Sequence, residues 1–161
     1  MNNNFYVICV YLLYLVTLPL IFFPASAQSE EVAICGPVSG QSYFHFSGIW
    51  EKNKSGWSKD GISKGRTVLK KIKNNEYDLL FVDATGLPTS ARQEGGKVLI
   101  IRKSKREIAV MHGTSKVIEI YNFYKENDGS LKYDHLQNKG GGLPIEKSSL
   151  FTGKCYSINF D

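Results

Sequence analysis

Two antiparallel strands and the turn between them can be identified in the stretch from Val117 to Leu136, VIEIYNFYKENDGSLKYDHL. Apolar and polar residues alternate on both sides of Asp128-Gly129, and this dipeptide between alternating runs is the strongest short-range signal for a β-hairpin. We therefore predict that the runs Val117–Tyr124 and Leu131–Leu136 pair with each other.

Short apolar or alternating runs separated by turn residues recur along most of the chain, and helical periodicity is nearly absent. Asn74-Asn75 predicts a second hairpin, because asparagine tolerates the positive φ of a tight turn. We expect an all-β fold, an antiparallel meander of eight or nine strands that forms a sandwich or a small barrel. The other predicted strands are Tyr43–Phe46, Thr67–Ile72, Tyr77–Val82, Val98–Ile101, Ile108–Met111, Ser148–Phe151 and Tyr156–Ile158.

Three segments rich in Gly, Ser, Asn and Lys are expected to be loops: residues 51–65, 85–96 and 138–144. The third contains three consecutive glycines. Loops carried by a rigid β scaffold are frequent positions for binding residues, although an ordinary connection is the commoner role.

The N-terminal residues have the layout of a secretory signal peptide. An apolar run from Val7 to Phe23 is followed by Pro24 and small residues, which predicts cleavage between Ala27 and Gln28. An uncleaved membrane anchor is the alternative, because the n-region lacks Lys and Arg and the run is nearly long enough to span a bilayer. We expect residues 28–161 to form a single β-rich domain, which works in the periplasm or outside the cell.

Cys35 lies near the start of this domain and Cys155 near its end. An even cysteine count in an oxidising compartment predicts that the two form a disulfide bond. The alternative of a cysteine nucleophile would need a thiolate base and a reducing setting, and the sequence indicates neither. The two ends of the domain would then be linked covalently.

The chain is basic, with 20 Lys and Arg against 15 Asp and Glu. Clusters at residues 70–73 and 102–106 have the charge to attract an acidic polymer or a membrane surface, whereas we do not expect nucleic acid as a partner. A net charge of +5 also simply keeps a small domain in solution. The candidate binding residues are Trp57, Tyr121, Arg102, Lys103, Lys105 and Arg106.

Three residues in or beside apolar runs, Asp83, His112 and Glu119, are the candidate catalytic groups. Asp78 and Asp83 fall on opposite faces of one strand, which argues against a paired-carboxylate glycosidase. Glu119 shares a face with Tyr121 and is placed to reach into a pocket, although cross-strand pairing with a lysine is the commoner outcome. The histidines lack metal-ligand spacing, so no metal or other cofactor is expected.

The order of several short motifs resembles a family of small uncharacterised exported proteins of Gram-negative bacteria. The resemblance covers nearly all of residues 28–161, although this chain runs past Cys155 to Asp161. It implies a periplasmic or secreted protein with one compact domain, and it assigns no catalytic residue. The motifs are Gly56-Trp57, Asp60-Gly61-Ile62, Tyr77 to Asp83, Gly95-Gly96-Lys97-Val98, Ile118 to Phe123, Lys139-Gly140-Gly141 and Lys147-Ser148-Ser149.

From these features we expect a disulfide-linked binding or interaction module. A small apolar ligand inside the sheet is one expected partner, and an acidic polymer or membrane surface bound by the basic clusters is another. A periplasmic or extracellular hydrolase is the alternative, and it would require His112, Glu119 and Asp83 to cluster around a pocket.

Overall fold

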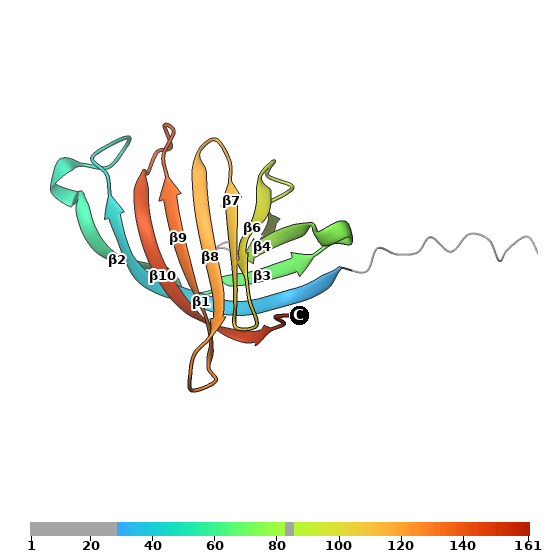
Figure 1. Cartoon of the computed structure of the whole chain (residues 1–161). Coiled ribbons are helices and arrows are strands. Elements are labelled where there is room, and N and C mark those ends of the chain that lie inside the picture. Colours follow the sequence, from blue (N-terminus) through green and yellow to red (C-terminus); the bar gives the residue numbers. More distant parts are fainter. Residues whose placement is uncertain (1–28, 83–85) are drawn as a thin grey trace, which may run out of the picture.

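The computed structural model describes residues 29–82 and 86–161, which form ten β-strands in a single sheet and two one-turn 3-10 helices (Figure 1). The predicted signal peptide and its cleavage residues, Ala27 and Gln28, lie outside the described residues. The elements in chain order are β1 (Glu30–Phe44), η2 (Lys52–Lys54), β2 (Gly56–Ile62), β3 (Arg66–Lys71), η3 (Lys73–Asn75), β4 (Tyr77–Val82), β5 (Pro88–Ser90), β6 (Lys97–Lys103), β7 (Glu107–Gly113), β8 (Val117–Lys125), β9 (Leu131–Lys139) and β10 (Lys147–Ile158).

All strand pairs are antiparallel, and the strand order is β5-β4-β3-β1-β10-β9-β8-β7-β6. The long strand β1 pairs with β10 along one edge, while its other edge pairs first with β3 and then with β2. The expectation of an all-β antiparallel fold is therefore confirmed, with ten strands in place of eight or nine. No helix in the described part of the chain is long and apolar enough to cross a membrane.

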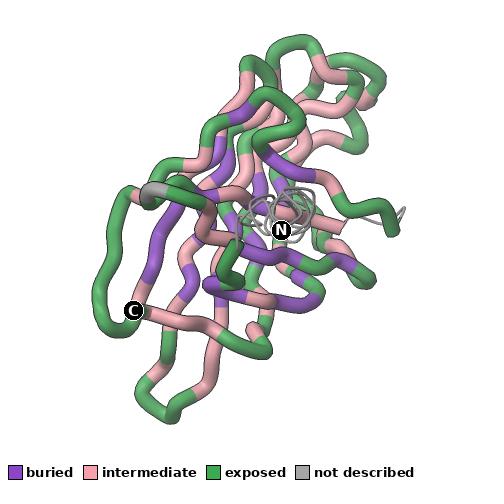
Figure 2. Tube along the Cα trace, turned by 90° about the vertical axis from the view of Figure 1, so that its right-hand side faces the viewer, coloured by how far each residue is buried: buried purple, intermediate pink, exposed green. Residues whose placement is uncertain are grey.

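The sheet curls into an open half-barrel, so the fold is neither a sandwich of two sheets nor a closed barrel (Figure 1). Strands β4 and β6 approach each other across the open side. The segment between β5 and β6 folds against β4, because the Ala91 amide donates to the Leu79 carbonyl at 2.9 Å. The segment also closes on itself, since the Gly96 amide donates to the Ala91 carbonyl at 2.9 Å. Figure 2 shows buried residues along the strands and exposed residues at most of the turns.

Both predicted hairpins are present. In the β8–β9 hairpin the Glu126 amide donates to Ser130, and Gly129 has a φ of 89°, so the turn spans residues 127–129. In the β3–β4 hairpin the connection is the helix η3, and Asn75 supplies the positive φ of 60°. Asparagine and glycine therefore provide the left-handed backbone that each turn needs.

The strands predicted at the two ends of the domain are shorter than the observed ones, and the first, Tyr43–Phe46, also extends two residues past the end of β1. Strand β1 begins at Glu30 and ends at Phe44, and β10 is one strand where the sequence predicts two. Gly36-Pro37 interrupts the alternation in β1, and the register shifts there accommodate the interruption. Cys35 and Cys155 are register partners, and they form the predicted disulfide.

Two of the predicted loops contain strands. Strand β2 lies within residues 51–65 and pairs with β1, and the short β5 lies within residues 85–96 and pairs with β4. Most residues of strand β2 are partly or fully exposed, so neither face of the strand needs a row of apolar side chains. Its sequence therefore lacks the alternation of apolar and polar residues by which a strand is predicted. The third predicted loop, residues 138–144, overlaps the end of β9 by two residues, because β9 extends to Lys139.

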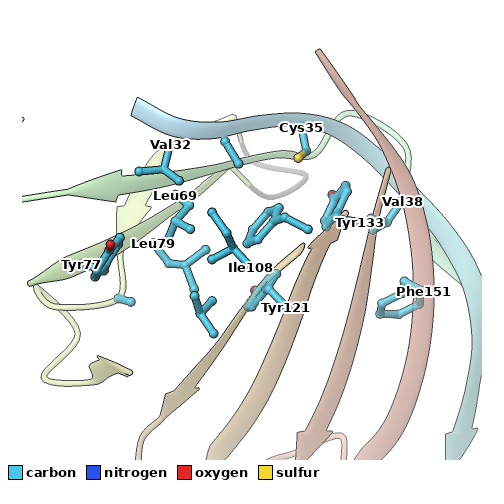
Figure 3. Packing of buried hydrophobic residues seen from close by; sticks show 14 residues of the cluster. Val32, Cys35, Val38, Leu69, Tyr77, Leu79, Ile108, Tyr121, Tyr133 and Phe151 are labelled. Atoms are coloured by element: carbon cyan, nitrogen blue, oxygen red, sulfur yellow. The ribbon is translucent and has the colours of Figure 1, made fainter. Parts of the chain in front are cut away.

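The hydrophobic core fills one end of the half-barrel, between the β3–β4 side and the β7–β9 side (Figure 3). Leu69 and Leu79 from the first side are fully buried, as are Val110 and Phe123 from the second. Tyr133 packs beside Phe123 with the ring centroids 5.8 Å apart, and its hydroxyl donates to the Gly36 carbonyl at 2.8 Å. The core holds the two walls together and leaves space between them further along the strands.

Candidate functional site: a buried carboxylate in the half-barrel cavity

A cavity of about 370 Å³ lies between the two walls of the half-barrel. This volume is within the range of small-molecule sites. The wall formed by β7, β8 and β9 contributes mainly polar side chains, and the opposite wall contributes a mixture of apolar and polar ones. Among the lining residues are Val38, Ile62, Arg66, Thr67, Phe81, Val82, Thr89, Glu94, His112, Val117, Glu119, Tyr121, Tyr133, His135, Gln137, Lys139 and Leu143.

Strand register places a cluster of polar side chains on the β7–β9 wall. Glu119 of β8 lies opposite His112 of β7 and opposite Gln137 of β9. The neighbouring pair on the same face is Tyr121 and His135. Because side chains alternate between the two faces of a strand, all five residues face the inside of the half-barrel.

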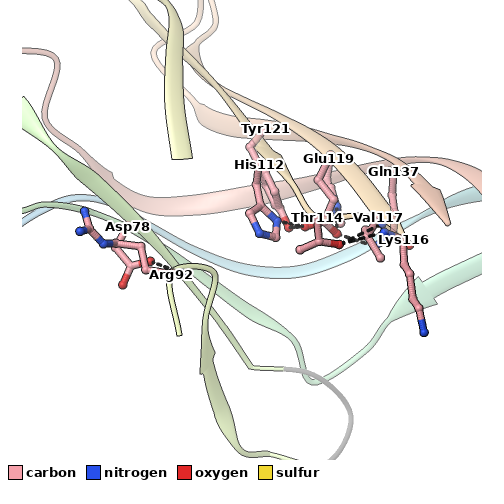
Figure 4. Close-up of polar contacts among 10 residues, drawn as sticks. Asp78, Arg92, His112, Thr114, Lys116, Val117, Glu119, Tyr121 and Gln137 are labelled. Atoms are coloured by element: carbon pink, nitrogen blue, oxygen red, sulfur yellow. Dashed lines mark hydrogen bonds and ion pairs between the residues drawn. The ribbon is translucent and has the colours of Figure 1, made fainter. Parts of the chain in front are cut away.

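Glu119 accepts four hydrogen bonds and is 6% exposed. Figure 4 shows it beside three of the donor residues, His112, Tyr121 and Gln137. His112 Nδ1 and the Tyr121 hydroxyl donate to its Oε2, each at 3.1 Å. His135 Nε2 donates to Oε1 at 3.1 Å, and Gln137 Nε2 donates to the same oxygen at 2.5 Å. Both carboxylate oxygens are therefore satisfied, as a buried charge requires.

These donors decide the ionisation of the carboxyl group. Burial by itself raises the pKa of Glu119, but the hydrogen bonds from His112, His135 and Gln137 outweigh it and hold the pKa well below its ordinary value. The phenol of Tyr121 responds in the opposite direction, because its burial and the adjacent Glu119 charge raise its pKa well above the ordinary value. Glu119 is thus an anion and Tyr121 a neutral donor.

Aromatic stacking fixes the rings of the cluster. The His135 ring stacks on Tyr121 with the centroids 4.2 Å apart and an interplanar angle of 9°. Tyr121 also stacks on Phe123 of the core with the centroids 6.2 Å apart. The polar cluster is therefore held on one side by its hydrogen bonds and on the other by the hydrophobic core.

His112 has a second constraint. Its Nε2 atom is buried and has no hydrogen-bond partner in the described part of the chain. It packs against Gly96, where a Cβ atom would lie only 2.1 Å from Nε2. The imidazole is thus confined between Glu119 and the backbone that precedes β6.

The pKa of Glu119 predicts a loss of stability in acid. Because the folded-state pKa lies below the reference value of 4.5, the ionised carboxylate contributes stability above about pH 5. This contribution is lost progressively as the pH falls below that value toward the folded-state pKa. Urea unfolding between about pH 7 and about pH 3 should show a decline in wild type that is smaller in Glu119→Gln.

Glu51→Gln is the control for this measurement. Glu51 is exposed and, among the described residues, pairs only with Lys54, which is also exposed, so its substitution removes one titrating carboxyl group without disturbing the cavity. Its unfolding should follow the wild-type decline. An equal decline in Glu119→Gln would show that another group governs acid stability.

The structure brings together three of the residues singled out from the sequence: His112, Glu119 and Tyr121. The expectation that Glu119 pairs with a lysine is wrong, because the donors opposite it are His112 and Gln137. Asp83 lies outside the described residues. Asp78 faces away from the cavity lining and accepts hydrogen bonds from Ser90 Oγ at 2.7 Å and the Arg92 amide at 3.2 Å (Figure 4).

The other candidate binding residues lie elsewhere. Trp57 of β2 is 67% exposed and contacts Tyr43 edge to face, with the ring centroids 5.5 Å apart. The basic residues Arg102, Lys103, Lys105 and Arg106 are exposed at the β6–β7 connection, and none of them lines the cavity. Trp57 and the basic cluster therefore do not form one site with Tyr121.

Sequence reasoning missed His135 and Gln137 as parts of the site. Their signal was the β8–β9 hairpin itself, because a three-residue turn at 127–129 places Gln137 opposite Glu119 and His135 opposite Tyr121. Counting residues outward from this turn along both strands therefore predicts these two pairs.

Within residues 29–82 and 86–161, no group of three or more His, Cys, Asp or Glu side chains is arranged to hold a metal ion. The two histidines that contact Glu119 use their facing nitrogens as donors to the carboxylate. The chain as a whole matches no protein-family model, no curated protein and no solved structure.

Proposed function

We propose that this protein is an exported, disulfide-linked binding module that holds a small molecule in the cavity of its half-barrel. The observation that carries the proposal is a cavity of about 370 Å³ that has a preorganised polar cluster on one wall. Small-molecule sites typically combine apolar walls with a few fixed polar groups that orient the ligand. Phe81 and Val117 are among the apolar residues, and the groups around Glu119 supply the fixed polar atoms.

The proposed export rests on two features. The N-terminal sequence has the layout of a signal peptide, and disulfides persist in oxidising compartments such as the periplasm and the cell exterior. The Cys35–Cys155 bond therefore fits a periplasmic or secreted protein. The resemblance to small exported proteins of Gram-negative bacteria points to the same location, and membership of that family is part of the proposal.

A hydrolase is the second candidate, because His112 and Glu119 form the carboxylate–imidazole pair that a general base needs. The geometry favours it less than binding. Nε2 of His112, the atom that would take a proton, is buried against Gly96 and contacts no hydroxyl group in the described residues. A nucleophile is therefore not placed beside this base.

Binding of an acidic polymer or membrane surface by the basic clusters has less support than the cavity. Lys70 pairs with Glu31 at 3.7 Å, and Arg102 pairs with Glu107 at 2.5 Å. Arg106 donates to the Lys125 carbonyl at 3.1 Å and to Asn127 at 3.0 Å. Part of the positive charge at these positions is thus offset within the protein.

A substitution that fills the cavity tests the proposed function. Val117 lines the cavity, whereas its neighbour Ile118 is 55% exposed on the outer face. We expect wild type and Ile118→Trp to bind the neutral dye N-phenyl-1-naphthylamine saturably, and Val117→Trp to lose at least about tenfold in affinity because the indole occupies the ligand volume. Fluorescence titration measures this.

The comparison is valid when circular dichroism shows the same β-sheet content in all three proteins. Equal dye binding by Val117→Trp and wild type would place the dye outside the cavity. The absence of saturable binding in wild type would count against a small-molecule cavity altogether. As a separate measurement, native mass spectrometry of protein purified from the exporting cells would identify any small molecule that the protein retains.

A further inference from the structure

We propose that the cavity recognises a ligand whose inner end is a primary ammonium group or a similarly strong hydrogen-bond donor. This inference rests on the proposed binding function and adds the chemical class of the ligand. It follows from the direction of the hydrogen bonds on the β7–β9 wall and from the charge that they surround.

Each of the four polar side chains around Glu119 uses one hydrogen-bond donor to contact its carboxylate. A carboxylate only accepts hydrogen bonds, so the facing nitrogen of His135 carries a proton and the amide nitrogen of Gln137 points toward Glu119. The remaining polar atom of the Gln137 amide, Oε1, is then an acceptor. The Tyr121 hydroxyl donates to Glu119 as well and keeps only lone pairs. The wall therefore offers acceptors to a ligand.

The carboxylate of Glu119 is ionised and has no lysine or arginine partner among the described residues. The only ion-pair partners of Glu119 among the described residues are His112 and His135. Its low pKa keeps the carboxylate ionised in the pH range where proteins are stable. A charge in a cavity that is shielded from water acts more strongly on a ligand than a charge on the surface does. An ammonium group would be attracted by this potential, and a ligand carboxylate would be repelled.

The basic residues of the cavity lie at strand ends. Arg66 is the first residue of β3 and is exposed, and Lys139 is the last residue of β9 and is half-buried. Glu94 also lines the cavity and has no ion pair with a described residue. The carboxylate of Glu119 is thus more deeply buried than Arg66, Lys139 or Glu94, and it sets the preference for the inner end of a ligand.

Three probes of equal length and different head group test this inference: n-hexylamine, 1-hexanol and hexanoate. Each is titrated into the oxidised wild-type protein near neutral pH and low salt, and the shifts of the Gln137 side-chain amide and the Glu119 backbone amide are followed by NMR. We expect n-hexylamine to bind tightest and hexanoate weakest, with at least about a tenfold difference in Kd between these two. Glu119→Gln should reduce this difference severalfold, whereas Glu51→Gln should leave it unchanged.

The outcomes separate the two proposals. Hexanoate binding in the cavity as tightly as n-hexylamine would overturn the ammonium preference and leave the proposed binding function standing. If no probe shifts either amide signal and N-phenyl-1-naphthylamine also fails to bind, the binding function itself fails. The wild-type ranking decides the question even if Glu119→Gln does not fold, because it needs no variant.

Discussion

Replacing Gly96 with alanine is expected to lower the free energy of unfolding by about 3 kcal/mol. The added Cβ would lie 2.1 Å from His112 Nε2 and 2.6 Å from its Cδ2. The imidazole has no room to retreat, since it is 2% exposed and its Nδ1 is bonded to Glu119. Either the hydrogen bond to the buried carboxylate breaks or the backbone before β6 moves.

Gly113→Ala is the matched control for this substitution. Gly113 is adjacent to His112 in the sequence, its backbone does not need glycine, and an added Cβ would meet no atom within 4 Å. Urea unfolding should therefore show a large loss for Gly96→Ala and a change within about 0.5 kcal/mol for Gly113→Ala. Equal stability of the two variants would mean that the contact between Gly96 and His112 does not constrain the cluster.

Removing the disulfide is expected to cost about 4 kcal/mol. Cys35 and Cys155 are 120 residues apart in sequence, so the bond closes nearly the whole domain into one loop and restricts the unfolded chain. It also joins β1 to β10, the two strands that link the β3–β4 side to the meander of β6 to β9. The variant with both Cys35→Ala and Cys155→Ala should unfold at a much lower urea concentration than oxidised wild type.

A reductant provides the internal control. It should lower the unfolding midpoint of wild type toward that of the double variant and leave the double variant itself unchanged. A midpoint in the double variant equal to that of oxidised wild type would show that the paired strands hold the ends of the domain without the bond.

Much of the polar cluster follows from local sequence. Residues 112, 119, 121, 135 and 137 all belong to the meander β7–β8–β9, in which each strand is joined to the next by a short turn. The β7–β8 turn lies at Ser115-Lys116, where the Thr114 hydroxyl accepts from the amides of Lys116 and Val117 (Figure 4). The sequence predicted these strands and placed Glu119 and Tyr121 on one face correctly. The partners His135 and Gln137 follow only when the strand register is carried from the turn along both strands.

Other features were not accessible from sequence patterns. Strand β2 and the first part of β1 carry too little apolar alternation to be recognised, and they become strands only because a neighbouring strand pairs with them. The contact of Gly96 with His112 joins the connection before β6 to the inside of β7. It arises from the way the chain folds back at that edge.

The sequence by itself determined that the chain is an antiparallel β-protein, where its main hairpins turn and which cysteines pair. These properties depend on alternation, on residues that accept positive φ and on cysteine count, all of which are local or compositional. Only the tertiary structure decided that the sheet curls so that Arg66, Thr67 and Phe81 face Glu119 across a cavity. The physical reason is that curling depends on pairing between strands as distant as β1 and β10, and on a core built from both walls.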